Sequence, residues 1–142
     1  VDRRSNCSIT AIYTVLADGG DLDDPIVDAT RAIVDGHIIL SRALAESGVY
    51  PAIDLSRSLS RLMPGIVDQA HHAAAARFRQ LWSSHELNSD LIMLGAYAQG
   101  SDTTLDVAIS KRQEMMDFIR QPMDDIISLD DARAQLIEGM VA

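Results

Sequence analysis

Histidine and cysteine are the residue types most able to bind a metal or to attack a substrate, and this sequence has few of them. His71, His72 and His85 fall in one predicted helix, but adjacent histidines on a helix point in different directions, and no carboxylate follows at chelating spacing. Cys7 has no histidine or asparagine constellation that would make its thiol a nucleophile. We therefore expect surface histidines, an unreactive small side chain at Cys7, and no metal site.

Arg61 and Tyr50 are the other side chains that could take part in binding or catalysis. A guanidinium is a planar cation that can stabilise charge spread over phosphoryl oxygens, and an aromatic ring can stack on a base. By the residue pattern alone, however, Arg61 is interpreted as a surface arginine that pairs with a nearby acid. Tyr50 precedes Pro51 and is interpreted as a half-buried packing residue. The residues by themselves leave both interpretations open.

Alternating strands and helices are predicted for the first half of the chain, which must position these two residues. Residues 8–16 are rich in β-branched side chains and apolar on both faces, which is typical of a strand covered on both sides. Pro25 follows several acidic residues and predicts the start of a short helix over residues 26–34. The remaining elements predicted here are a strand at 37–41, a helix at 42–47 that Gly48 stops, and an extended segment at 50–54.

The second half is predicted to be entirely helical, and the change falls at Pro64 and Gly65. Apolar residues then recur at steps of three and four, which predicts a long amphipathic helix to about His85. Further helices are predicted at residues 87–98, at 105–119 after a cap at Ser101 or Asp102 and before Pro122, and from a capping box at Ser128 to Met140. The pattern indicates a helical bundle.

The composition sets limits on function. The formal charge of −9 over 142 residues would repel nucleic acid and anionic lipid. A single cysteine excludes an internal disulfide framework, and no apolar run approaches the roughly 18 residues of a membrane span. Only 4% of the residues are aromatic, so aliphatic side chains and alanine must fill the core, which favours helices. We expect a soluble, mostly helical cytosolic protein.

Three motifs follow one another in the middle of the chain: residues 35–45 (DGHIILSRALA), 50–54 (YPAID) and 58–63 (SLSRLM). Their order and spacing resemble the late catalytic-domain signature of type III secretion and flagellar protein-export ATPases. Residues 95–102 (GAYAQGSD) are similar to the C-terminal domain of that family and favour the flagellar branch. More distantly, the likeness extends to the catalytic subunit of rotary ATP synthases.

The resemblance covers nearly the whole chain and implies a fold. It implies the final strands and helices of a RecA-like P-loop domain at residues 1–64, an α/β remnant. An all-α helical domain is implied at residues 65–142. We therefore expect the chain to be a C-terminal piece of such an ATPase.

The resemblance also implies site residues. Arg61 aligns with the arginine finger, which one subunit inserts against the γ-phosphate bound by the next subunit of the ring. Tyr50 matches the aromatic residue that packs on adenine in the ATP synthase relative. Met123 falls in the segment that closes the other side of the base, where the relative has phenylalanine, and a thioether can also cover a ring.

Several partners are implied in the same way. Asp21, Asp23 and Asp24 align with the loop that touches the central stalk, and their charge suits a basic coiled-coil partner. The resemblance implies a homohexamer at the cytoplasmic face of an export apparatus, peripheral to the membrane at most. Its other implied partners are a peripheral regulator, export substrates and chaperones, and nucleic acid is not among them.

ATP with Mg²⁺ is the cofactor that the resemblance implies for the full-length protein. This chain has no G-x-x-x-x-G-K-[ST] loop and no apolar strand that ends in an acidic metal-binding residue. We therefore expect that the chain alone neither binds Mg-ATP tightly nor hydrolyses it. Cys7, where the family usually has glycine, and the additional basic residue Arg57 depart from the family pattern. The alternative hypothesis is a non-catalytic helical interaction module that binds a stalk or chaperone protein.

Overall fold

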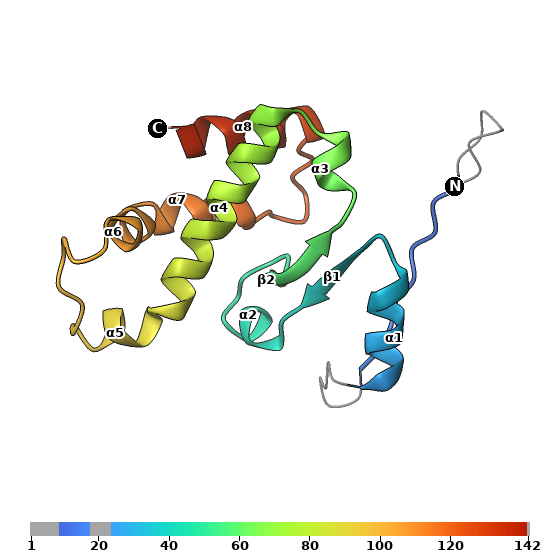
Figure 1. Cartoon of the computed structure of the whole chain (residues 1–142), viewed down its shortest axis with the longest axis horizontal. Helices are drawn as coiled ribbons and strands as arrows, with labels where there is room; N and C mark the ends of the chain where they lie inside the picture. The colour runs from blue at the N-terminus through green and yellow to red at the C-terminus, as the bar shows by residue number, and fades with distance from the viewer. Residues whose placement is uncertain (1–8, 18–23, 142) are drawn as a thin grey trace. The chain divides into compact units, whose positions relative to one another are not determined.

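The computed structural model of this chain describes residues 9–17 and 24–141. The described residues divide into two compact units, one up to Val34 and one from Asp35 onward (Figure 1). The first unit contains helix α1 (Pro25–Ile33), which begins one residue before the predicted start. The carboxylate of Asp24 caps this helix by accepting hydrogen bonds from the amides of Ile26 and Val27, at 2.7 and 3.3 Å.

The strand predicted at residues 8–16 is wrong over the described part of that range. Residues 9–17 are irregular, and the side chains of Ile9, Ile12 and Leu16 are 91%, 92% and 92% exposed. A strand exists only when a neighbour accepts and donates its backbone hydrogen bonds. No strand of the described chain pairs with this segment, so its β-branched residues have no sheet to join.

A two-stranded antiparallel hairpin opens the second unit, and it confirms the predicted strand at 37–41 and the helix after it. Strand β1 (Gly36–Leu40) pairs with β2 (Ile53–Ser60), and α2 (Arg42–Glu46) lies between them in the sequence. Gly36 pairs with Ser60 and Leu40 pairs with Ile53, so five residues of β1 face eight of β2. The three extra residues form a bulge in β2.

Six helices follow the hairpin in the described chain, and they confirm the predicted helical second half. They are α3 (Met63–Ile66), α4 (Gln69–Leu87), α5 (Ser89–Met93), α6 (Thr103–Ser110), α7 (Arg112–Ile119) and α8 (Leu129–Val141). As predicted, Asp102 caps α6, and the amide of Asp131 donates to the hydroxyl of Ser128 at 3.1 Å at the start of α8. None of the described helices has both the length and the apolar character needed to cross a membrane.

Three predicted helices have different bounds in the structure. The helix expected directly after Gly65 begins only at α4, because the backbone is extended at Val67 and Asp68 provides a new cap. The next predicted helix, 87–98, ends with α5, because Gly95 takes a φ angle of 65°. Residues 105–119 form two helices, α6 and α7, which meet at Lys111.

The core of the second unit lies around α4, which packs against α6, α7, α8 and β2 (Figure 1). Aromatic and aliphatic side chains fill it together: Phe78, Leu81, Trp82, Leu105, Ala108 and Met115. The rings of Phe78 and Trp82 stack with centroids 6.3 Å apart. Leu55 of the β2 bulge, although only half-buried, packs against the same cluster, so the hairpin and the helices share one core.

Candidate functional site

Arg61 directly follows β2, at the end of the hairpin where β1 begins. Its backbone amide donates a hydrogen bond of 2.8 Å to the carbonyl of Asp35, one residue beyond the Gly36–Ser60 pair. A side chain at Gly36 would place its Cβ only 2.8 Å from the carbonyl oxygen of Leu59, so the strands approach closely because this residue is glycine. The backbone of Arg61 is therefore held in place, although Arg61 as a whole is exposed to solvent.

Tyr50 lies on the connection between α2 and β2, before a cis peptide bond to Pro51. Its neighbour Val49 is buried, whereas Tyr50 itself is 58% exposed. The carbonyl of Tyr50 accepts a hydrogen bond of 3.0 Å from the amide of Gln121. This bond brings together two segments that lie 71 residues apart in the sequence.

Met123 lies two residues beyond Gln121, on the connection between α7 and α8. Its side chain is 98% exposed. The side chain of Gln121 donates to the carbonyl of Asp125 at 2.8 Å, and the amide of Asp125 donates to the carbonyl of Pro122 at 3.2 Å, so Met123 is carried on a turn. The structure thus brings the backbone segments of Tyr50 and Met123 together, with both side chains accessible.

Arg61 and Tyr50 lie beyond opposite ends of the hairpin. The paired ladder runs from Gly36 to Leu40, four residue steps of about 3.3 Å, or about 13 Å in all. Arg61 follows the Gly36 end, and Tyr50 precedes the Leu40 end. The two residues are therefore not brought together into one site within this chain.

The acidic segment has a structural role in its described part. Asp24 caps α1, as given above, while Asp21 and Asp23 lie outside the described residues, as does Cys7. Within the described residues, no group of three histidine, cysteine, aspartate or glutamate side chains is placed to hold a metal ion. His85 is half-buried, which the expectation of surface histidines did not anticipate.

The surroundings of His85 form a charged cluster that sequence reasoning missed. The guanidinium of Arg112 lies 4.1 Å from the ring centroid of Trp82, one helical turn before His85 and Glu86. Burial lowers the pKa of His85, and the nearby charge of Arg112 lowers it further. Burial also lowers the pKa of Arg112, and the charge of Glu86 opposes that shift. Arg112 and Trp82 are 30 residues apart, so no helical spacing could have indicated this contact.

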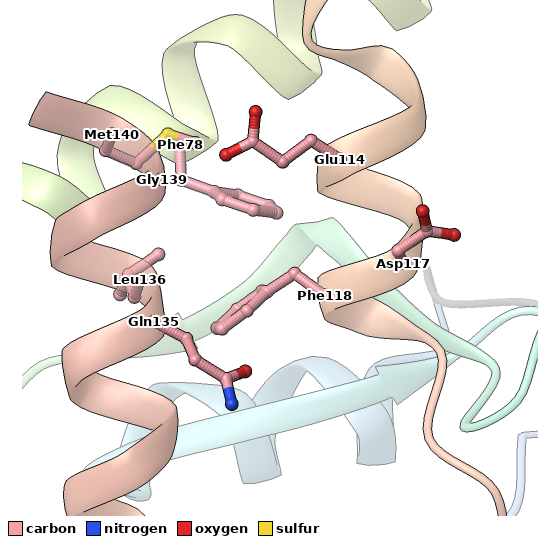
Figure 2. A pocket seen from close by; sticks show the side chains of 8 residues that line it. All are labelled: Phe78, Glu114, Asp117, Phe118, Gln135, Leu136, Gly139 and Met140. Atoms are coloured by element: carbon pink, nitrogen blue, oxygen red, sulfur yellow. The ribbon is translucent and has the colours of Figure 1, made fainter. Parts of the chain in front are cut away.

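An open groove of about 260 Å³ lies between α4, α7 and α8 and was also not predicted. Figure 2 shows Phe78 and Phe118 facing the groove, with Leu136 and Met140 of α8 on one side and Glu114 and Asp117 of α7 on the other. The groove therefore has apolar walls and an acidic edge. It contains none of the predicted site residues.

Two family models match the sequence. Residues 67–138 match the C-terminal domain of the type III secretion ATPase EscN. Residues 1–60 match the nucleotide-binding domain of the ATP synthase alpha/beta family. Together with the architecture described above, these matches confirm the predicted fold class, a remnant of a RecA-like domain followed by a helical domain.

Individual relatives agree with the family models. The flagellum-specific ATP synthase of Pseudomonas aeruginosa is 51% identical over 129 residues, which are 91% of this chain and 29% of the relative. The assembled ATPase EscN from the type III secretion system of enteropathogenic E. coli gives a TM-score of 0.89 at 41% identity, covering 94% of this chain and 32% of that one. A structure of assembled EscN in complex with its central stalk EscO gives a TM-score of 0.77 at 39% identity, covering 82% of this chain and 29% of that one.

This chain spans about three tenths of the length of the relatives that it matches. Within that share, both the sequence and the fold agree along nearly the whole chain. The model of the EscN C-terminal domain by itself covers half of the residues. The chain therefore belongs to the family of type III secretion and flagellar export ATPases.

Proposed function

We propose that this chain is the C-terminal part of a homohexameric ATPase that energises protein export, in which Arg61 acts as an arginine finger on nucleotide held by the neighbouring subunit. The observation that carries this proposal is the position of Arg61, pinned to Asp35 at one end of the hairpin while Tyr50 lies at the other. A residue that serves a neighbour's site has to lie away from the nucleotide-facing part of its own chain.

The chemistry of a guanidinium suits that role. ATP with Mg²⁺, when bound, supplies the phosphoanhydride bond that is cleaved. The planar fork of Arg61 offers hydrogen bonds to the charge that develops on the phosphoryl oxygens. The Arg61–Asp35 backbone bond and the close strand contact at Gly36 reduce the freedom of the finger, so less ordering is needed when the nucleotide arrives.

Tyr50 and Met123 form the proposed adenine site of the same chain. The Gln121–Tyr50 hydrogen bond joins their backbone segments, and both side chains expose the surface that a base would cover. An aromatic face and a thioether both stack on a purine with little base selectivity. This sequence lacks a G-x-x-x-x-G-K-[ST] loop, so we propose that Mg²⁺ and the phosphates are held by the remainder of the full-length protein.

The proposed partners follow from the relatives. EscN has been solved in an assembled state and in complex with its central stalk EscO. We propose the same kinds of contact for this protein, with Asp21, Asp23 and Asp24 facing a stalk at the cytoplasmic face of an export apparatus. Because the carboxylate of Asp24 is engaged by α1, Asp21 and Asp23 carry most of this attraction. A peripheral regulator, export substrates and chaperones complete the proposed set.

We also propose a domain boundary at residues 64 and 65. The two matched ranges, 1–60 and 67–138, lie on either side of it. Leu55 nevertheless packs against the helical core across that boundary. The hairpin of the first proposed domain therefore shares a core with the helical domain.

The role of Arg61 is tested by measuring ATP turnover of the full-length hexamer. For Arg61→Ala we expect a loss of about a thousandfold in kcat, with assembly unchanged by size measurement. Arg61→Lys should recover little of the loss, because an ammonium lacks the planar fork. Arg42→Ala, which removes an exposed arginine on α2, is the matched control and should keep normal turnover. Near-normal turnover of assembled Arg61→Ala hexamers would contradict the proposal and favour a non-catalytic interaction module.

A further inference from the structure

The bulge in β2 is held together by specific hydrogen bonds. Between Leu59 and Asp54, β2 advances five residues while β1 advances only from His37 to Ile39. The hydroxyl of Ser58 closes the excess loop by donating to the carbonyl of Asp54 at 2.6 Å and accepting from the amide of Ile39 at 3.0 Å. The bulge is therefore bonded to both strands at its base, and a displacement of its tip is passed to them.

The tip of the bulge contacts the helical bundle. Leu55 packs against the core cluster around Trp82. Next to it, the hydroxyl of Ser56 donates a hydrogen bond of 2.5 Å to a carboxylate oxygen of Glu86, near the C-terminal end of α4. Glu86 thus connects the longest helix of the bundle to β2, the strand that precedes Arg61.

The connection from α4 to Arg61 has two ends, and each is held by different contacts. At one end, Arg61 is held by its bond to Asp35 and by the close strand contact at Gly36. At the other end, α4 packs against α6, α7 and α8, so a displacement of these helices would also displace Glu86. The hairpin lies between these two ends, and the hydrogen bond from Ser56 to Glu86 joins its bulge to α4.

From this arrangement we infer that Ser56 and Glu86 are positioning residues for Arg61, which couple the placement of α4 to the placement of the finger. The inference rests on the proposed role of Arg61. A shift of the helical bundle, such as one imposed by a protein bound to it, would then raise or lower turnover in the neighbouring site without any contact to nucleotide. The bond requires a hydroxyl donor at position 56 and an acceptor oxygen at position 86.

The experiment compares variants of the full-length hexamer by kcat, by KM for ATP and by assembly. For Ser56→Ala and for Glu86→Ala we expect kcat to fall about fivefold with KM unchanged, because the proposed adenine site on Tyr50 is not touched. Ser56→Thr keeps the hydroxyl and should restore kcat. The double variant should be no slower than either single variant, since both remove the same bond. Glu46→Gln, an exposed carboxylate on α2, is the control and should leave kcat unchanged.

Arg61→Ala is included in the same series so that the two proposals can fail separately. If Arg61→Ala abolishes turnover while Ser56→Ala and Glu86→Ala retain full kcat, the coupling is wrong, whereas the proposed role of Arg61 is unaffected. A fall in kcat that Ser56→Thr does not reverse also overturns the coupling, because it would report a packing defect. If Arg61→Ala itself retains turnover, the proposed function fails first. Should one variant not assemble, the other removes the same bond from the opposite partner and decides the question.

Discussion

The guanidinium of Arg112 lies 4.1 Å from the centroid of the Trp82 ring, and this contact joins α7 to the most buried part of α4. Trp82 is only 1% exposed, so the cation covers a ring that is otherwise enclosed by apolar side chains. A cation over an aromatic face is favourable, and the long stem of arginine adds apolar contact. The pair therefore stabilises the packing of α7 on α4 by charge and by area together.

Removing this cation should destabilise the helical part. For Arg112→Ala we expect the free energy of unfolding to fall by about 1–2 kcal/mol. Urea unfolding followed by tryptophan fluorescence measures it directly, because Trp82 is the only tryptophan of the chain. Arg79→Ala, an exposed arginine on the same helix as Trp82, is the matched control and should change stability little. Equal stability of the two variants would show that the cation contributes nothing.

The ion pair of Asp68 and Arg133 predicts a pH effect at the start of α4. The hydrogen bond from the amide of His71, and then the bond from Arg133, lower the pKa of Asp68 below its ordinary value of 3.8. A lowered folded-state pKa means that the carboxylate stabilises the fold above pH 3.8, and that this contribution is lost as the pH falls through the folded-state value.

Asp68→Asn tests this effect because asparagine can still cap the helix but carries no charge. In urea unfolding at pH 7 the unchanged protein should be more stable than Asp68→Asn, and the difference should shrink as the pH falls through the lowered pKa of Asp68. Glu138→Gln on α8 serves as the control carboxylate. A stability difference that persists unchanged at the lower pH would mean that charge at Asp68 is not the cause.

Gly36 should tolerate no side chain. A Cβ at this position would lie 2.8 Å from the backbone oxygen of Leu59, which cannot move aside as a flexible side chain would. We expect Gly36→Ala to cost about 1–3 kcal/mol and to lower the turnover of the full-length hexamer, because Arg61 follows the same strand pair. Gly65→Ala is the control, since no atom lies within 4 Å of its added Cβ. If both variants behave alike, the close approach of the strands is not needed.

The proposed adenine site predicts effects on substrate affinity. Tyr50→Ala in the full-length hexamer should raise KM for ATP about tenfold, whereas Tyr50→Phe keeps the ring and should leave KM unchanged. Met123→Ala should raise KM less, because a thioether covers less of a base than a ring does. A steady-state titration with ATP distinguishes these outcomes. An unchanged KM in Tyr50→Ala would remove Tyr50 from the site.

Local signals allowed much of this fold to be predicted from the sequence. Pro25 after a run of acids marked α1, and the Ser128–Asp131 capping box marked α8, because each of these signals acts through its own neighbouring backbone. The strand predicted at 8–16 failed for the opposite reason. Its residues favour a sheet, but pairing depends on another strand, and no local pattern provides one.

The candidate site also contains some residues that were predicted from the sequence and some contacts that were not. Arg61, Tyr50 and Met123 were identified by resemblance, and the Gln121–Tyr50 bond that joins two of their segments spans 71 residues. The Arg112–Trp82 and Ser56–Glu86 contacts span 30 residues each and arise from the packing of separate elements. Contacts of this kind depend on tertiary structure, and arginine, serine and glutamate are mostly exposed residue types that give no local signal of such a contact.

β2 has three more residues than β1 in the paired region, and this odd excess determines which side chains lie on each face of the hairpin. Paired residues of antiparallel strands point to the same side, so Ile53 shares a face with Leu40, and Leu59 shares a face with His37. Positions 37 and 40 of β1 point in opposite directions, since they are three residues apart. Ile53 and Leu59 therefore lie on opposite sides of the sheet, although simple alternation would place them together. Each side of this hairpin receives an apolar residue from β2, which equips it to be sandwiched between two layers.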